Sequence, residues 1–262
     1  LEREVGTPLL RRSGRGLRPT EAGIAFKRGV DAAIHALDDG LASVEQLLDP
    51  ESGRVRLTFA PSLGGWLVPD LVAGFRRHYP RVTFDVHRLD ALGPSHDDTA
   101  LVEGAVDLEL TPHRPTTSAV AWRRLFREPL TLAVPPGHRL AGRPEVWLAD
   151  AGAEDFVMLA PEPPLQYAVD ELCADAHVTP RVAFVADDLT TQRGFVAAGL
   201  GVAVLPAGGN DPSVASPDGV TLVPLADRLA MRDINLLWPS ERRLLPAAEL
   251  FRRYVLTEYR TS

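Results

Sequence analysis

The sequence predicts an α/β fold of two units, preceded by a long helix and a short basic head. Three observations support this prediction: strand and helix patterns alternate from residue 54 onward, apolar residues recur at helical spacing between 20 and 48, and basic residues gather before residue 29. The length of 262 residues, with 45% hydrophobic and 24% charged residues, is that of a globular chain and excludes a disordered or fibrous protein.

The charge of the head differs in sign from that of the rest. Residues 1–28 carry seven basic and three acidic side chains, a net charge of +4, so the remaining chain must carry −11 to give the overall −7. A basic segment on an acidic body is typical of nucleic-acid contact, although a solvated basic N-terminus with no partner accounts for the charge equally well. Residues 1–6 have the pattern of a helix end stopped by Gly6, and because residue 1 is Leu rather than Met we expect further residues to precede it.

A helix is expected next, from about residue 20 to 48. Thr20 is its candidate N-cap, and no proline interrupts the chain before Pro50. Its apolar residues are spaced alternately by four and three, as in the a/d seam of a coiled coil. This favours a dimerisation helix over the generally commoner amphipathic helix packed on its own domain. The seam consists of Val30, Ile34, Leu37, Leu41, Val44 and Leu48.

Strands and helices alternate through the body, after a linker at 49–53. Strands are expected at 54–60, 82–89, 106–110, 130–134, 156–159, 182–185, 202–205, 220–223 and 234–238. Helices are expected at 65–79, 97–104, 165–176, 190–198 and 247–256. This order predicts two α/β units, each with a parallel sheet covered by helices, and a small-molecule crevice between them at the strand ends.

Polar groups follow three of these strands. Ser62 lies where a strand leads into a helix, and its hydroxyl and the backbone N–H groups there could receive a carboxylate or another anion. His113 is the only histidine with a candidate role in the crevice, and Thr190 and Thr191 lie near the first turn of another helix. The alternative is that Ser62 and Thr190 are only helix caps, the usual role of these residue types there.

Motifs of the common enzyme classes are absent from the sequence. It contains no GxSxG, GxxxxGK[ST], HExxH, CxxC or GxGxxG pattern, so we expect no enzyme activity, no metal site and no cofactor. Cys173 lies on the apolar side of a predicted helix and is expected to be a buried, inert thiol. No apolar run reaches the roughly 20 residues of a membrane span, and we expect a cytoplasmic protein with no membrane partner.

Several segments resemble a LysR-type transcriptional regulator, in the order of that family. Residues 1–12 (LEREVGTPLLRR) are similar to the end of the recognition helix and the first strand of the wing. Residues 15–23 (RGLRPTEAG) are similar to the rest of the wing and the start of the linker helix. Residues 106–110 (VDLEL) and 135–141 (PPGHRLA) resemble two stretches of the effector domain, and 194–206 (GFVAAGLGVAVLP) is the most specific match.

The resemblance implies a domain organisation. Residues 1–19 would be a remnant of a winged helix-turn-helix, 20–52 a linker and dimerisation helix, and the rest a two-lobed periplasmic-binding-protein-like effector domain. The lobes would be 54–126 with 228–262, and 127–227. A small molecule in the cleft would change how a homodimer or homotetramer engages promoter DNA. The positions that the resemblance places in the cleft are Ser62, Leu63, Thr111, Pro112, Thr190 and Thr191.

The same resemblance limits the DNA contact to the wing. The family's first two helices and most of its recognition helix would precede Leu1, so this chain alone is expected to bind DNA weakly or not at all. The wing side chains expected to touch phosphates are Arg11, Arg12, Arg15 and Arg18. The alternative is a cytoplasmic small-molecule-binding module with no DNA-binding activity of its own. In either case a small carboxylate is the candidate effector.

Overall fold

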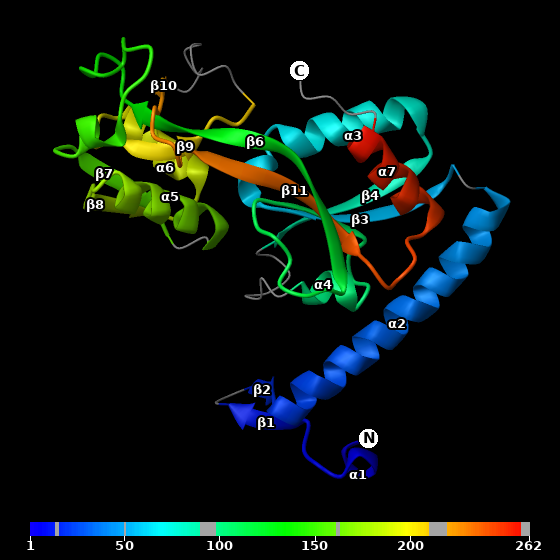
Figure 1. Ribbon diagram of the computed structural model, residues 1–262. Helices are drawn as coiled ribbons and strands as arrows, with labels where there is room; N and C mark the ends of the chain where they lie inside the picture. The colour runs from blue at the N-terminus through cyan, green and yellow to red at the C-terminus, as the bar shows by residue number, and fades with distance from the viewer. Residues whose placement is uncertain (14–15, 50, 90–97, 161–162, 210–218, 258–262) are drawn as a thin grey trace.

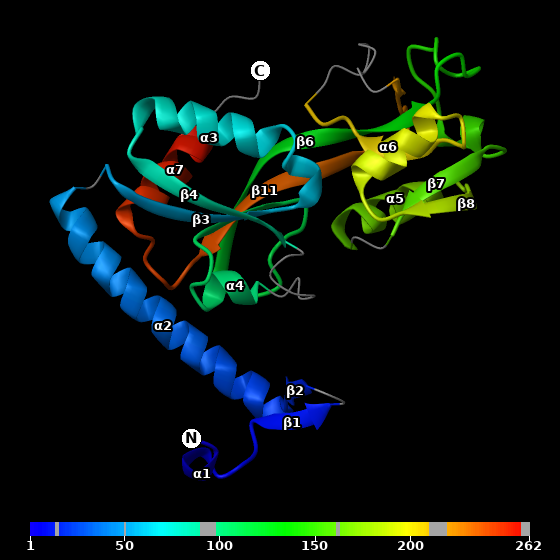
Figure 2. The same cartoon turned by 180° about the vertical axis from the view of Figure 1, so that it is seen from behind.

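The computed structural model describes residues 1–13, 16–49, 51–89, 98–160, 163–209 and 219–257, with the backbone alone described at 43, 45–48, 163 and 164. Two bodies of helices and strands are joined by a pair of long strands, and a long helix leads away from one body to a small N-terminal head (Figures 1 and 2). Among the described residues, no helix is both long and apolar enough to cross a lipid bilayer.

The head consists of a short helix and a hairpin. The elements are α1 (Glu2–Val5), β1 (Leu10–Ser13) and β2 (Gly16–Pro19), and the two strands pair antiparallel. Gly6 ends α1 with a φ of 77°, which confirms the predicted helix end. The Glu2 carboxylate accepts hydrogen bonds from the backbone N–H groups of Leu9 (2.7 Å) and Leu10 (3.1 Å), and these bonds lower the pKa of Glu2. The exposed Glu2 thereby ties α1 to the hairpin.

The long helix α2 (Glu21–Leu48) confirms the predicted helix and its cap. The Thr20 hydroxyl accepts from the N–H of Gly23 at 3.0 Å and donates to the carbonyl of Pro8 at 2.8 Å. Gly23 is required by a close approach, since a Cβ there would lie 1.9 Å from the carbonyl oxygen of Leu9. The start of α2 is therefore packed directly on the chain that enters β1.

A seven-stranded sheet connects the two bodies, in the order β10-β6-β11-β5-β3-β4, with β9 paired to β6. Its strands are β3 (Gly53–Phe59), β4 (Val82–Arg88), β5 (Leu108–Thr111), β6 (Val120–Val134), β9 (Ala203–Pro206), β10 (Thr221–Pro224) and β11 (Met231–Pro239). β3 runs parallel to β4 and β5, whereas the pairs that involve β6 or β11 are antiparallel. A separate parallel pair is formed by β7 (Asp155–Leu159) and β8 (Arg181–Ala186).

The prediction of a parallel sheet in each unit is therefore wrong for the strands that join the bodies. β6 begins at Val120 rather than at residue 130; it pairs with β11 through residue 129 and with β9 and β10 beyond it. The chain crosses between the bodies along β6 and returns along β11 (Figure 1), so the two crossing strands run in opposite directions. The sequence hides the first half of β6 because four charged side chains between 123 and 128 interrupt its apolar pattern.

Each body has its own hydrophobic core. The first core lies under α3 (Leu67–His78) and α7 (Pro246–Thr257), where the rings of Phe75 and Phe251 pack edge to face at 5.1 Å. The second core lies under α5 (Pro163–Asp175), and a further cluster packs against α6 (Leu189–Ala197). The remaining short helices are α4 (Thr99–Val102), η1 (Pro61–Leu63) and η3 (Leu148–Ala151).

Two details bear on the sequence predictions. Cys173 is buried in the second core, which confirms the predicted burial, and burial raises the pKa of its thiol to about 11, in keeping with the predicted lack of reactivity. The predicted lobe boundaries stay predictions: the one between 126 and 127 falls inside β6, and the one between 227 and 228 lies just before β11.

We predict that Gly23→Ala loosens the head from α2. The added methyl group must displace the backbone of Leu9, at a cost of about 1–3 kcal/mol. Native-state hydrogen exchange of the β1–β2 amides would measure this loosening as a lower free energy of opening of the hairpin. Gly29→Ala is the matched control: no atom lies within 4 Å of a Cβ there, so alanine should stabilise α2 by about 0.5–1 kcal/mol. Equal effects of the two substitutions would contradict the prediction.

Candidate functional site

Two cavities lie where the two bodies face each other across β6 and β11. The first, which we call the Trp66 pocket, has a volume of about 260 Å³. One wall comes from η1 and the start of α3, and the other from α6, β9 and the turn after β9. Its lining residues are Ser62, Gly65, Trp66, Leu189, Arg193, Leu205, Pro206 and Gly208. The pocket therefore joins groups that are more than 120 residues apart in the sequence.

The Trp66 pocket is rich in hydrogen-bond donors. The indole N–H of Trp66 is buried and has no hydrogen-bond partner among the described residues. The Ser62 hydroxyl accepts from Arg232, which leaves its own proton to be donated. Among the described lining residues, Arg193 is the only charged one. A lining that offers hydrogen-bond donors and, among its described residues, no acid is the complement of a small anion.

Trp66 is held in place by its surroundings. Its ring packs at 5.8 Å from that of Phe126, and a Cβ on Gly209 would lie 2.5 Å from it. Gly209 also has a φ of +71°, a conformation that L side chains rarely adopt. The turn after β9 therefore lies against the indole ring, and only glycine allows this approach.

The second cavity, the His113 pocket, has a volume of about 360 Å³ and a mixed lining. It lies between the chain that follows β5, the helix α5 and the crossing strands. Its lining residues are Pro112, His113, Arg127, Tyr167, Ala168, Glu171, Met231, Arg232 and Asp233. Three of these are basic or imidazole groups and two are acids, so this pocket lacks the one-sided charge of the Trp66 pocket.

A buried ion pair connects the two pockets. Arg232 of β11 and Glu128 of β6 lie 2.6 Å apart, with side-chain exposures of 3% and 2%. Arg232 also donates to the Ser62 hydroxyl at 3.0 Å, and Glu128 accepts from the backbone N–H of Gly208 at 3.1 Å. The remaining guanidinium nitrogen of Arg232, Nη1, is buried with no partner among the described residues. The pair thus fixes Ser62 and Gly208, which face each other across the Trp66 pocket.

A second buried polar cluster lies behind the His113 pocket. Nε2 of His113 is 3.4 Å from the Glu109 carboxyl and 3.6 Å from that of Asp98, and Nδ1 is 2.5 Å from the Thr111 hydroxyl. Burial and, secondarily, the charge of Asp98 raise the pKa of Glu109 to about 8, against the weaker opposing hydrogen bond from Thr58. A pKa of about 8 favours the protonated form of Glu109 at neutral pH.

The structure separates the predicted site residues into two groups. Ser62, Pro112 and His113 line the pockets. Leu63 is fully buried in the first core, and Thr111 is buried against His113. Thr190 and Thr191 are exposed and line neither of the two pockets. Ligand contact by any of these residues stays a prediction.

The alternative role of Ser62 and Thr190 as helix caps is wrong. Ser62 lies within η1, whose N-cap is Ala60. The cap of α6 is Asp188, which accepts from the backbone N–H of Thr191 at 2.9 Å.

Sequence reasoning missed Trp66, Glu128 and Arg232. Glu128 and Arg232 lie two residues before the predicted strands 130–134 and 234–238, and nothing in the sequence pairs positions 104 residues apart.

A third candidate site is the hairpin of the head. Arg11 and Arg18 are exposed and lie directly opposite each other in the β1–β2 register. Like charges in this position repel unless an anion lies between or over them. Arg12 is exposed and pairs with Leu17, and Arg15 lies outside the described residues. Elsewhere in the described ranges, no cluster of His, Cys, Asp or Glu side chains is arranged to hold a metal ion.

Comparisons with known proteins agree on one family. The family described as LysR substrate binding domain matches residues 48–260. The chain is 32% identical over 259 residues to the uncharacterized HTH-type transcriptional regulator YybE of Bacillus subtilis (strain 168), covering 99% of this chain and 86% of that protein. This confirms the sequence-based resemblance.

Solved structures share the fold. Full-length CbnR complexed with its target DNA superposes with a TM-score of 0.74 at 20% identity, covering 97% of this chain and 85% of that one. The effector binding domain of BenM with its effector benzoate superposes with a TM-score of 0.65 at 23% identity, covering 78% of this chain and 93% of that one. Together with the family match, they confirm the predicted two-lobed α/β effector-domain fold behind a long helix.

We predict that Glu109→Gln makes stability less dependent on pH. The carboxyl titrates near 4.5 when unfolded and near 8 when folded. The folded state therefore keeps a proton that the unfolded state releases, and wild-type stability falls as pH rises between these values. The free energy of unfolding of the variant minus that of the wild type, measured with urea, should increase by at least about 1 kcal/mol from pH 5 to pH 8. The exposed Glu145→Gln should show no such trend, and a constant difference for Glu109→Gln would refute the prediction.

Proposed function

Because this chain belongs to the LysR-type family of transcriptional regulators, we propose that it binds a small carboxylate in the Trp66 pocket and contacts promoter DNA through its N-terminal hairpin. As a member of this family it is a regulator and not an enzyme. A cytoplasmic location, where promoter DNA is accessible, is part of the proposal.

The observation that carries the proposed effector class is the buried, unpartnered indole N–H of Trp66, a residue of a pocket whose described lining contains no acid. A buried donor without an acceptor costs free energy, which a ligand that supplies the acceptor recovers. The Ser62 hydroxyl gives the same carboxylate a further donor. The benzoate of BenM is a carboxylate, which supports this ligand class.

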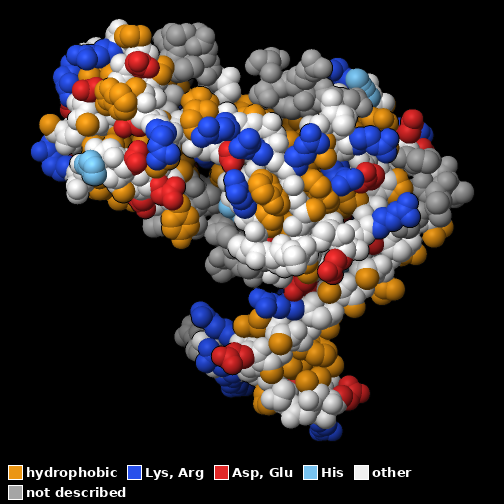
Figure 3. Space-filling view, in the orientation of Figure 1, with side chains coloured by type: hydrophobic (Ala, Val, Ile, Leu, Met, Phe, Trp, Pro, Cys, Tyr) orange, Lys and Arg blue, Asp and Glu red, His pale blue; other side chains and the backbone are white. Residues whose placement is uncertain are grey.

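Dimerisation through α2 is the second part of the proposal. The seam side chains whose exposure is described are all open to solvent, from 39% for Val30 to 71% for Leu37, and the side chain of Leu48 lies outside the described ones. Figure 3 shows hydrophobic side chains along the outer edge of this helix. An exposed apolar seam of this length is stabilised when a second α2 covers it. A homodimer or homotetramer would place two hairpins on the same DNA.

We predict that Trp66→Phe weakens carboxylate binding while preserving the pocket. Phenylalanine keeps an aromatic ring against Gly209 but removes the N–H donor. A panel of small carboxylic acids beginning with benzoate should contain one that raises the melting temperature of the wild type. Its dissociation constant should increase about 10-fold in Trp66→Phe, as for the loss of one hydrogen bond to a charged group, and remain unchanged in Trp147→Phe, whose ring is 58% exposed. Equal affinity in all three proteins would refute the proposed site.

DNA contact by the hairpin has its own test. Fluorescence anisotropy with a duplex at low salt should show weak, salt-dependent binding by this chain. Replacing Arg11 and Arg18 by Gln should reduce the slope of log K against log salt by about 2, one for each lost phosphate contact, while the exposed Arg143→Gln should leave the slope unchanged. If the wild-type chain shows no binding at low salt, the alternative of a small-molecule module without DNA binding of its own is favoured.

A further inference from the structure

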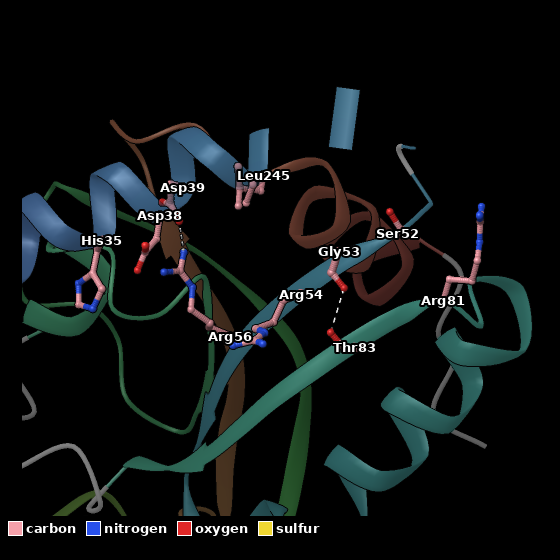
Figure 4. A pocket seen from close by; sticks show the side chains of 11 residues that line it. His35, Asp38, Asp39, Ser52, Gly53, Arg54, Arg56, Arg81, Thr83 and Leu245 are labelled. Carbon is pink, nitrogen blue, oxygen red and sulfur yellow. Dashed lines mark hydrogen bonds and ion pairs between the residues drawn. The ribbon is translucent and has the colours of Figure 1, made fainter. Parts of the chain in front are cut away.

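A network of two arginines and two aspartates fastens α2 to the first body. Asp39 of α2 accepts from Arg56 of β3 at 2.7 Å and from Arg242 at 2.9 Å. Asp107, which precedes β5 and is fully buried, accepts from the same two guanidiniums at 2.7 and 3.3 Å. Figure 4 shows Asp39 pointing from the helix toward Arg56.

The charges of this network are balanced only when α2 is in place. The body contributes Arg56, Arg242 and Asp107, a net charge of +1, and Asp39 supplies the missing negative charge. Burial lowers the pKa of Arg56, but the hydrogen bonds and charges of Asp107 and Asp39 outweigh it and raise that pKa. Since Asp39 and Arg56 are each only 18% exposed, solvent and salt screen their attraction less than that of a surface pair.

Among the described residues, the other ion pairs at this edge of the body are more exposed than those of the network. A cavity of about 550 Å³ lies between α2 and the edge formed by β3 and β4 (Figure 4). Arg54 and Arg81 at its rim pair with Asp85 and Asp49, but these pairs are between 36% and 68% exposed and contribute little. The cavity gives the helix room to swing about its attachment at Asp39.

The body side of the network is built from the same segments as the two pockets. β3 carries Arg56 and leads to Ser62, and β5 follows Asp107 and leads to His113. β11 carries Arg232 near its start and leads to Arg242. These three strands are neighbours in the sheet, in the order β11-β5-β3. A displacement of any of them at the pockets would therefore move one of the groups that hold Asp39.

We propose that Asp39 is the positioning residue that fixes the angle of α2, and with it the head, relative to the ligand-binding body. The inference rests on the proposed function only in taking the head as the part that contacts DNA. Glu21 is separated from Asp39 by about 27 Å of helix at 1.5 Å per residue, so a swing of about 10° moves the head by about 5 Å. Two copies of such a head would change their separation on DNA accordingly.

The test measures the distance from the head to the body in the whole chain, without DNA or effector, so its outcome is independent of the proposed function. Spin labels on Ser13→Cys in β1 and Ala73→Cys in α3, both exposed positions, report the distance by pulsed electron resonance. Samples are diluted with unlabelled chain to suppress distances between protomers. Cys173 is buried and its thiol pKa is raised to about 11, so we expect it to react slowly with the spin label. The chain without added cysteines, treated with the same label, is the control for this.

Asp39→Asn should broaden the distance distribution or shift it by about 5 Å or more, and Arg242→Gln should do the same. The neighbouring Asp38→Asn, an exposed residue of the same cavity, should match wild type, and Asp39→Glu should retain most of the wild-type distribution. Melting temperatures measured alongside separate this effect from a loss of folding. An unchanged distribution in Asp39→Asn, or an equal change in Asp38→Asn, would overturn the proposal.

Discussion

The antiparallel pair of β6 and β11, fastened by the buried ion pair of Glu128 and Arg232, is the constraint on which the rest of the molecule depends. Both strands pass from one hydrophobic core to the other, so their pairing sets how the two bodies face each other. The ion pair lies at the crossing and reaches Ser62 on one side and Gly208 on the other. A buried pair is costly to desolvate, and here its hydrogen bonds go to Ser62 and Gly208, which line the Trp66 pocket.

The chemistry of the Trp66 pocket follows from this arrangement. Glu128 is engaged by Arg232 and by a backbone N–H, so its charge is neutralised and does not face the cavity. The carboxylate of Glu128 is thus used inside the protein, while the indole N–H of Trp66, which lines the pocket, has no partner among the described residues. Behind the His113 pocket, burial raises the pKa of Glu109 to about 8, which disfavours a second buried negative charge there.

Charge also organises the molecule at larger scale. The chain as a whole is acidic, yet its hairpin presents Arg11 and Arg18 opposite each other. Between the head and the body, the network around Asp39 uses two cations and two anions so that no uncompensated charge is left at the joint. A single helix thereby connects the head proposed to contact DNA to the body that carries the proposed carboxylate pocket.

Local patterns predicted much of the fold. The cap at Thr20, the helix to Leu48 and most strands of the body follow from spacing and turn chemistry, because short-range sterics and periodic burial decide them. The first half of β6 was missed because its pairing with β11, rather than its own apolar pattern, makes it a strand. Helix α4 is likewise shorter than its predicted range.

The sequence by itself determined the family, the order of the elements, the exposed seam of α2 and Ser62 as a cavity-lining group. Only the tertiary structure decided which side chains share a pocket. It brought Trp66 to Gly209, Arg232 to Glu128 and Asp39 to Arg242, and it placed Thr190 and Leu63 away from the cavities. The physical reason is that these contacts join positions far apart in the chain. Their stability comes from mutual burial and charge neutralisation, which no local pattern of residues encodes.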